Sequence, residues 1–357
     1  MRKRILSVLS NTNIAELLTQ RAERETGILS RAFRRAARSA FLWPEEVSDL
    51  VSQNRSLTEL RSIGPFIEKQ IRQWIEEPRR SKTVPAIRRD FLSLAEARRL
   101  LSVRPAWTKK LRGDLQMHTR WSDGSGTVAE MADAAANRSY EYIAITDHSK
   151  TLKIAGGMDE RALKRQGVEI AKVNAALSKS AAHVTVLRSI EMNLNPRGEG
   201  DMSPDSLRSL DLVLGSFHSA LRITEDQTER YLAALRNPQI HILGHPRGRI
   251  YNFRIGLKAD WPRVFAEASR LEKALEIDCY PDRQDLNVEL LKIARDHGTR
   301  ISLGTDAHHG WQLEFIDLGL AAALRAKIPA ERILNFMSIL ELKAWAKFVR
   351  DRTPSRR

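Results

Sequence analysis

Cysteine is nearly absent from this chain of 357 residues, in which Cys279 stands alone. A single thiol excludes an internal disulfide framework and a cysteine-rich zinc module. The fold must therefore depend on its core, and a reducing cytoplasm is the compartment that we expect.

Long apolar runs are also missing. After the basic start Arg2-Lys3-Arg4, a short apolar stretch ends at Ser10, which is too short for a secretory signal, and no later run approaches the length of a membrane span. Glycine-rich phosphate loops of the GxGxxG or GxxxxGK type are absent as well, which argues against a nucleotide-binding fold of those kinds.

Positive charge is in excess, and it is unevenly distributed. The net charge is +15, and residues 1–110 hold 23 Lys and Arg against 12 Asp and Glu, which leaves only +4 for the rest of the chain. A basic excess in one part predicts a polyanionic partner for that part, and nucleic acid is the partner that we expect. A generally basic proteome is the alternative.

Residues 1–78 are predicted to form a small all-α domain. Asn13 can cap a first helix, and residues 30–42 give a second helix with an apolar face and an arginine-rich face. Further on, two short apolar segments flank the turn Ser62-Ile63-Gly64, and Pro65 suits the first turn of the second segment.

This layout is typical of a helix-hairpin-helix, in which backbone amides at the hairpin bind a phosphate without reading the base sequence. A plain pair of helices without a ligand is the alternative. The residues that we expect to contact DNA are Ile63, Gly64, Lys69, Arg72, Arg34 and Arg35.

Residues 79–112 are interpreted as a linker with one helix, and residues 113–357 as an α/β domain. Short apolar runs alternate there with amphipathic stretches, which predicts parallel strands joined by helices. Seven strands suit a closed or nearly closed (β/α) barrel, with an open doubly wound sheet as the alternative. The predicted strands are 114–118, 142–146, 184–190, 211–215, 240–244, 274–278 and 300–304, and the predicted helices are 127–138, 159–178, 225–235, 261–272, 285–297 and 331–350.

Histidines and carboxylates follow several of these strands. Because the carboxyl ends of parallel strands meet at one rim of a barrel, such side chains are expected to converge there. Imidazole and carboxylate ligands without thiolates suit Mn, Zn or Fe, and two or three ions are expected. The candidate ligands are Gln116, His118, Asp123, His148, Glu191, His218, His245, Asp306 and His308.

Five motifs give these residues a family resemblance. They are Gly113-Asp-Leu-Gln-Met-His118 with Ser122-Asp123-Gly124, Thr146-Asp-His148-Ser-Lys150, Gly215-Ser-Phe-His218, Gly244-His245-Pro-Arg247 and Gly304-Thr-Asp306-Ala-His308. In this order they resemble the PHP (polymerase and histidinol phosphatase) domain, above all the version at the C-terminus of bacterial family X DNA polymerases. The resemblance implies a distorted (β/α)7 barrel with up to three metal ions.

The resemblance also implies how the ligands group. His118, Glu191 and Asp306 would serve one ion, Glu191 would bridge to a second held by His218 and His245, and a third would be held by Asp123, His148 and His308. Many members have histidine where this chain has Gln116. The resemblance therefore implies a weakened first ion site.

Residues 1–78 are similar to the N-terminal helical domain of the same polymerases. The segment 79–112 is far too short for the polymerase catalytic region, and the Gly-Ser-x-Arg motif and the Asp-x-Asp pair of that region are not found. We therefore expect no nucleotidyl transfer, and a separate repair polymerase is a possible partner.

The predicted function is a metal-dependent phosphodiesterase on DNA, a 3′–5′ exonuclease or 3′-end processing enzyme, located in the cytoplasm at a bacterial nucleoid. Arg247, Lys150 and Arg283 are expected to neutralise phosphate charge. The alternatives are a small-molecule phosphomonoesterase of the histidinol-phosphatase type and a DNA-binding module whose barrel has lost catalysis.

Overall fold

Two units make up the chain, Met1–Val103 and Arg104–Arg357. The computed structural model describes residues 9–77, 83–179 and 184–352. Among these residues, no helix combines the length and the apolar character that crossing a membrane requires.

The first unit is helical, as predicted. Its elements are α1 (Asn11–Arg24), α2 (Gly27–Ser39), η1 (Ala40–Leu42), α3 (Val47–Ser52), η2 (Leu57–Glu59), α4 (Pro65–Glu76), η3 (Ala86–Arg88) and α5 (Leu94–Ser102). The first helix is capped by Ser10, and not by Asn13, whose side chain instead completes a capping box from inside the helix. In α2 the apolar face, with Phe33 and Ala36, is buried, while the four predicted arginines are exposed.

The predicted helix-hairpin-helix is only partly recognisable. Its second helix, α4, begins at Pro65 as expected, with Gly64 as the N-cap residue. The segment before the turn forms only the single 3-10 turn η2 where a helix was expected. The turn itself has Ser62 in the left-handed region at φ 69°.

The second unit alternates strands and helices. Its strands are β1 (Gly113–Met117), β2 (Tyr142–Ile145), β3 (Thr185–Arg188), β4 (Glu191–Asn193), β5 (Leu214–Ser216), β6 (Ile242–Leu243), β7 (Ala274–Asp278) and β8 (Arg300–Gly304). Its helices are α6 (Pro105–Thr108), α7 (Val128–Ala136), α8 (Glu160–Leu177), α9 (Pro204–Leu207), α10 (Thr228–Arg236), α11 (Trp261–Arg270), α12 (Val288–Asp296), α13 (Ile316–Ala326) and α14 (Ile339–Arg352), with 3-10 turns η4 (Lys153–Ala155), η5 (Gly310–Phe315), η6 (Ala330–Arg332) and η7 (Leu334–Phe336). The predicted one-helix linker 79–112 thus carries η3, α5 and α6.

All strand pairs are parallel, in the orders β1-β2-β3 and β4-β5-β6-β7-β8. Only Ser189 and Ile190 separate β3 from β4, so the two segments form one broken strand, and the described residues give seven strand positions. The ends of this sheet meet, because the amide of His118 donates to the carbonyl of Ala307 over 2.8 Å and that of Asp306 to Gln116 over 3.0 Å. The (β/α)7 barrel is therefore confirmed, and the open sheet was the wrong alternative.

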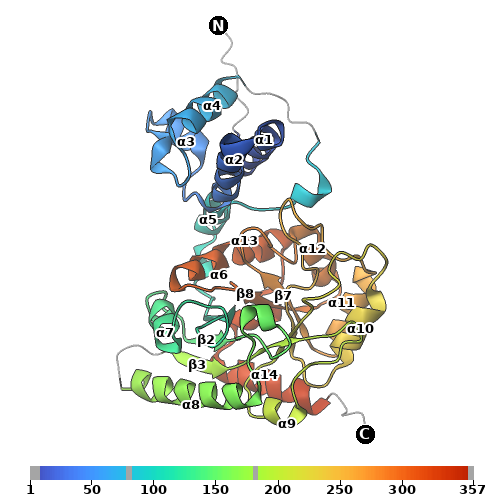
Figure 1. Cartoon of the computed structure of the whole chain (residues 1–357). Coiled ribbons are helices and arrows are strands. Elements are labelled where there is room, and N and C mark those ends of the chain that lie inside the picture. The colour runs from blue at the N-terminus through green and yellow to red at the C-terminus, as the bar shows by residue number, and fades with distance from the viewer. Residues whose placement is uncertain (1–8, 78–82, 180–183, 353–357) are drawn as a thin grey trace. The chain divides into compact units, whose positions relative to one another are not determined.

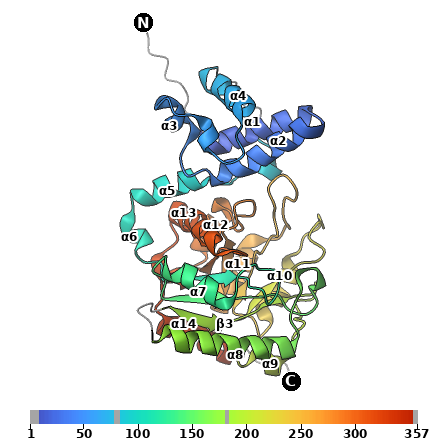
Figure 2. The same cartoon turned by 60° about the vertical axis from the view of Figure 1, so that its left-hand side comes forward.

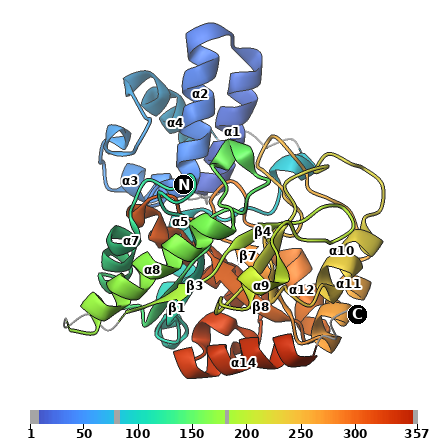
Figure 3. The same ribbon diagram turned by 60° about the horizontal axis from the view of Figure 1, so that its bottom comes forward.

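Helices surround the strands (Figure 1). Figure 2 shows α7 and α8 on the outer side of the early strands, and each packs on the strand that it joins. The helix α14 closes the N-terminal ends of the strands, where Trp345 and Val349 pack on Leu115, Ile242 and other buried residues (Figure 3).

The helix α13 was missed by the sequence reading. Its residues Ile316, Leu318 and Leu320 are buried along with most of its alanines, so it lacks the polar stripe that marks a surface helix.

Candidate metal centre

The carboxyl ends of the strands deliver eight of the nine predicted ligands to one place. These are His118 after β1, Asp123 in the loop that follows, His148 after β2, Glu191 at the start of β4, His218 after β5, His245 after β6, and Asp306 and His308 after β8. Parallel strands end at a common rim, which is why residues nearly 200 positions apart meet there.

Glu191 lies at the centre of this group. Its Oε1 is 2.7 Å from Nε2 of His245 and 3.2 Å from Nε2 of His218. Its Oε2 is 2.9 Å from Nδ1 of His148 and 3.6 Å from Nε2 of His118. Both oxygens thus face imidazoles from different strands, which is the arrangement that a bridging carboxylate needs.

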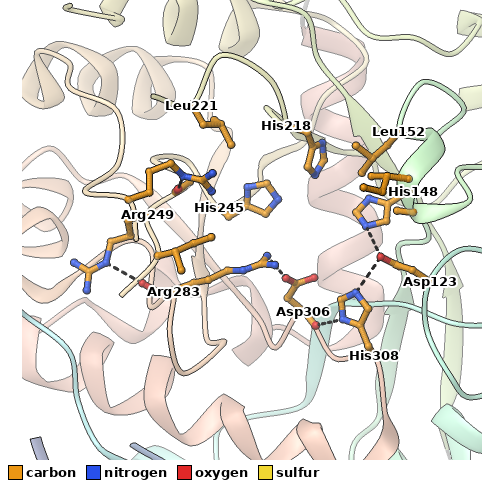
Figure 4. A pocket seen from close by; sticks show the side chains of 15 residues that line it. Asp123, His148, Leu152, His218, Leu221, His245, Arg249, Arg283, Asp306 and His308 are labelled. Atoms are coloured by element: carbon orange, nitrogen blue, oxygen red, sulfur yellow. Dashed lines mark hydrogen bonds and ion pairs between the residues drawn. The ribbon is translucent and has the colours of Figure 1, made fainter. Parts of the chain in front are cut away.

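Two aspartates complete the centre (Figure 4). Asp306 Oδ1 lies 2.9 Å from Nε2 of His118. Asp123 Oδ2 lies 3.4 Å from Nε2 of His308 and 3.6 Å from Nε2 of His148. The rings of His118 and His148 are stacked with centroids 4.4 Å apart, so the ligand atoms form one continuous cluster.

Three sets of ligand atoms lie within 4.8 Å of one another in the described residues. They are His118, Glu191 and Asp306; His148, Glu191 and His218; and His118, Asp123, His148 and His308. The first set equals the predicted first group, and the third contains the predicted third group. The second differs because His148 stands beside Glu191, while His245 joins through its contact with the same carboxylate.

The cluster fits divalent cations. Within the described part of the chain, His118 Nδ1, His148 Nδ1 and Glu191 Oε2 are buried without a hydrogen-bond partner. Buried polar atoms are normally paired, so atoms left open in this way indicate a ligand. Nitrogen and oxygen donors without a thiolate suit Mn, Zn or Fe.

The charges of the cluster favour ionised carboxylates. Burial would raise the pKa of Glu191, but the imidazoles of His148, His218 and His245 hold it well below its usual range. Burial would lower the pKa of His148, yet the neighbouring carboxylates of Glu191 and Asp123 raise it to about 10. The hydrogen bonds of His148 and His308 likewise keep the pKa of Asp123 low despite its burial.

Further residues orient the ligands. Asn193 Oδ1 lies 3.0 Å from Nδ1 of His218, which directs Nε2 of that ring to Glu191. The carbonyl of Asp306 lies 2.7 Å from Nδ1 of His308 and has the same effect on that ring. Sequence reasoning missed Asn193, whose role depends on a contact between neighbouring strands.

Asp147, directly before His148, supports the site from below. Its carboxylate accepts hydrogen bonds from the amide and hydroxyl of Thr119 at 2.7 and 2.6 Å and from Gln166 at 2.6 Å. This carboxylate thereby fixes the loop after β1, which carries Asp123.

Gln116 takes a different place from the other predicted ligands. It is fully buried, and with its amide oriented to suit its neighbours it donates to both oxygens of Glu276, at 2.6 and 2.9 Å. Burial and the nearby Asp278 raise the pKa of Glu276 well above its usual range. The first ligand set therefore forms from His118, Glu191 and Asp306, while Gln116 pairs with an acid on β7.

A pocket of about 290 Å³ opens above the cluster (Figure 4). Six of the predicted ligands line it, together with the basic residues Arg249, Arg254 and Arg283. The Arg283 guanidinium is paired with Asp306 and lies 3.5 Å from Asp278 Oδ2. Arg249 and Arg254 were not predicted, because they follow no strand end.

The other two predicted cations lie outside this lining. Lys150 pairs with Glu160 at 2.7 Å. Arg247 donates from its guanidinium to the carbonyl of Ile255 at 2.8 Å.

The predicted DNA contacts belong to the helical unit. Arg34, Arg35 and Lys69 are exposed, whereas Arg72 pairs with Glu68 at 2.8 Å. Ile63 is buried, and its amide donates to the carbonyl of Leu60 over 3.3 Å. DNA contact by these residues stays a prediction.

Comparison with known proteins agrees with the site. Residues 114–284 match the family model described as the PHP domain. The chain is 35% identical over 239 residues to "DNA polymerase/3'-5' exonuclease PolX" of Bacillus subtilis, which covers 67% of this chain but only 41% of that relative.

Two more comparisons involve shorter proteins. A "Probable phosphatase" of Caldicellulosiruptor bescii is 26% identical over 227 residues, covering 60% of this chain and 88% of the relative. The crystal structure of a histidinol phosphate phosphatase from Lactococcus lactis, complexed with Zn, L-histidinol and phosphate, covers 60% of this chain and 93% of its own, at 18% identity and a TM-score of 0.42.

Proposed function

Residues 114–284 form a PHP domain, and from this premise we propose that the chain is a metal-dependent phosphodiesterase that shortens DNA from the 3′ end. The observation that carries the proposal is the bridging position of Glu191, whose two oxygens face imidazoles from four strand ends. Such a carboxylate can hold two cations close enough to act on one phosphate.

The three ligand sets name the residues that would hold the ions. His118, Glu191 and Asp306 would hold one, Glu191 with His218, His245 and His148 a second, and Asp123, His148 and His308 a third. Bound cations would supply a water activated near neutral pH and charge that stabilises the phosphate in the transition state. Buried carboxylates with low pKa values stay ionised, which suits them to this task.

The protein's own cations support a phosphate substrate. Arg249, Arg254 and Arg283 line the pocket beside the cluster, and guanidinium groups pair well with phosphate oxygens. In the proposed reaction a water oxygen bonds to phosphorus while the bond from phosphorus to the 3′ oxygen breaks. The products are a nucleoside 5′-monophosphate and a strand that ends in a 3′ hydroxyl.

DNA as the substrate is supported by the helical unit and by the Bacillus subtilis relative, whose name includes a 3′–5′ exonuclease. The exposed arginines of α2, among them Arg34 and Arg35, offer sequence-independent contacts with phosphates. No nucleotidyl transfer is proposed, so a separate polymerase would have to fill any gap that is produced.

The direct test is digestion of DNA. Metal-loaded protein should shorten a 5′-labelled single strand and a nicked duplex with Mn, keeping the label, and His148→Ala should abolish the shortening. Release of phosphate from small monoesters without action on DNA would favour the phosphomonoesterase. Neither activity in protein that holds its ions would favour a non-catalytic DNA-binding module.

The role of the helical unit has a separate test. DNA affinity should fall steeply between about 50 and 200 mM salt, because phosphate contacts release counterions. The double variant Arg34→Ala/Arg35→Ala should flatten the salt dependence by about two contacts. A salt dependence equal to that of the unchanged protein would remove these arginines from the interface.

A further inference from the structure

A second hollow adjoins the metal pocket. It is lined by His218, Ala220, Leu221, Arg222, Ile223 and Arg254, and three of these, His218, Leu221 and Arg254, also line the metal pocket. The two hollows are thus continuous, but the second one contains no ligand other than His218. Cleavage of a small phosphate ester gives it no role.

The rim of this hollow combines exposed apolar side chains with arginines. Phe253 is 54% exposed, Ile255 46% and Ile223 38%, which is unusual for side chains of this size beside a polar site. The guanidinium carbon of Arg222 lies 4.5 Å from the centroid of the Phe253 ring. In the described residues no carboxylate forms an ion pair with Arg222, so its charge is available to an anion.

The exposed ring is held in a defined position. Ile250 and Arg254 exchange two backbone hydrogen bonds of 2.8 and 2.9 Å across the turn that carries Phe253. The amide of Tyr251 donates to the carbonyl of Asp282 over 2.7 Å, which ties the turn to the loop after β7. An aromatic ring kept exposed on an ordered turn is suited to contact a planar ligand.

We propose that this second hollow binds the nucleotide on the 5′ side of the scissile phosphate in a single strand of DNA. Its base stacks on Phe253 and the Arg222 guanidinium, and Arg254, which belongs to both hollows, neutralises the intervening phosphate. Stacking on aromatic rings with support from arginine is how proteins bind single strands without reading sequence. The inference rests on the proposed function and deepens it, because it makes an oligonucleotide a better substrate than a small diester.

The structure contains a matched control for this pair. Phe348 on α14 is 47% exposed, and the guanidinium carbon of Arg352 lies 5.4 Å from its ring centroid. This pair resembles Phe253 and Arg222 in chemistry and exposure, but its helix covers the opposite end of the barrel. Substitutions there report general effects of losing an exposed ring or charge.

The experiment compares two substrates in the full chain with Mn: a thymidine pentanucleotide and the p-nitrophenyl ester of thymidine 5′-monophosphate. Phe253→Ala and Arg222→Ala should each lower kcat/KM for the pentanucleotide about tenfold relative to the ester, chiefly through KM. Phe348→Ala and Arg352→Ala should leave the ratio of the two substrates unchanged.

A spectroscopic signal tests stacking directly. A pentanucleotide with 2-aminopurine next to the 3′-terminal nucleotide should lose fluorescence on binding to the unchanged protein, and Phe253→Ala should restore that fluorescence. If both substrates are cleaved and the Phe253 variant behaves like the Phe348 variant in both assays, the subsite is wrong and the proposed function stands. If neither substrate is cleaved, the proposed function fails and the subsite with it.

Discussion

The two ends of the barrel are built from the same strands but have opposite characters. At the carboxyl ends, seven ionisable side chains and Asp123 crowd around Glu191 with few apolar neighbours. At the amino ends, Leu115, Ile242 and Ala274 pack under α14 in a dry cluster. The comparison shows that one end holds the fold while the other end is free to hold charge, since parallel strands place their loops for chemistry at the carboxyl rim.

Each end contains an exception that tests this division. At the polar end, Gln116 turns away from the cluster to Glu276. At the apolar end, Lys273 is fully buried and donates to the carbonyl of Asn237 over 2.6 Å. If the division is real, changes at the first end should alter activity, and changes at the second should alter stability.

The largest effect is expected from Glu191→Gln at the polar end. The amide keeps the shape of the side chain but cannot bridge two cations as a carboxylate does, so phosphodiester cleavage should fall about a thousandfold, equivalent to several kcal/mol. Mn should raise the melting temperature of the unchanged protein and should raise that of the variant much less. Cleavage rates and thermal melts with and without Mn measure both effects.

The control for this change is Glu289→Gln, which removes an exposed carboxylate 2.8 Å from Lys292 on α12. It should affect neither cleavage nor the Mn-dependent melt. Normal cleavage by the Glu191 variant would show that its central position has no catalytic meaning.

The polar end was largely predictable from sequence because its ligands follow strand ends, where a short local pattern identifies them. His118, His148 and His308 are each recognisable from the few residues around them. What could not be predicted depends on contacts across the barrel. The pairing of Gln116 with Glu276 joins β1 to β7, and the support that Asn193 gives to His218 joins β4 to the loop after β5.

The apolar end was less predictable for a related reason. The predicted strands coincide closely with those observed, because buried parallel strands appear as short apolar runs. Which helix closes the barrel depends on long-range packing, and the helix α14 was included only as part of a longer predicted segment, 331–350. The positions of Arg249 and Arg254 at the pocket are equally non-local.

A smaller but still large effect is expected from Trp345→Ala at the apolar end. The indole is 6% exposed, packs in the cluster under the strands, and donates from Nε1 to the carbonyl of Glu272 over 2.9 Å. Its loss should lower the free energy of unfolding by about 3 kcal/mol, because it leaves a cavity and an unpaired carbonyl. Chemical denaturation measures the change, and Phe348→Ala on the exposed face of the same helix should cost less than about 0.5 kcal/mol.

The Trp345 variant also sharpens the division between the two ends. Below its melting temperature it should keep its Mn-dependent cleavage rate. A large loss of cleavage in folded variant protein would show that the apolar end controls the metal centre, and the division would then be wrong.

The smallest effect is expected from Lys273→Met, which should stabilise the protein. Burial lowers the pKa of the Lys273 ammonium to about 7 from its ordinary value of 10.5. At neutral pH the folded chain therefore bears the cost of a buried amine that the unfolded chain exposes to water. Replacement by an apolar side chain of similar length should raise the free energy of unfolding by about 2 kcal/mol at pH 7, less than full relief because the carbonyl of Asn237 loses its donor.

The gain from Lys273→Met should shrink as the pH rises from 7 to about 10. In that range the folded protein has already released the Lys273 proton while the unfolded chain still holds it, so unfolding takes up a proton and the unchanged protein becomes more stable with rising pH. The variant lacks this titration. Urea denaturation at several pH values measures the difference, with Lys343→Met on α14, an exposed lysine 3.1 Å from Asp211, as the control. A gain that stays constant or grows with pH would mean that Lys273 remains charged in the folded protein, and that the apolar end tolerates charge as the opposite end does.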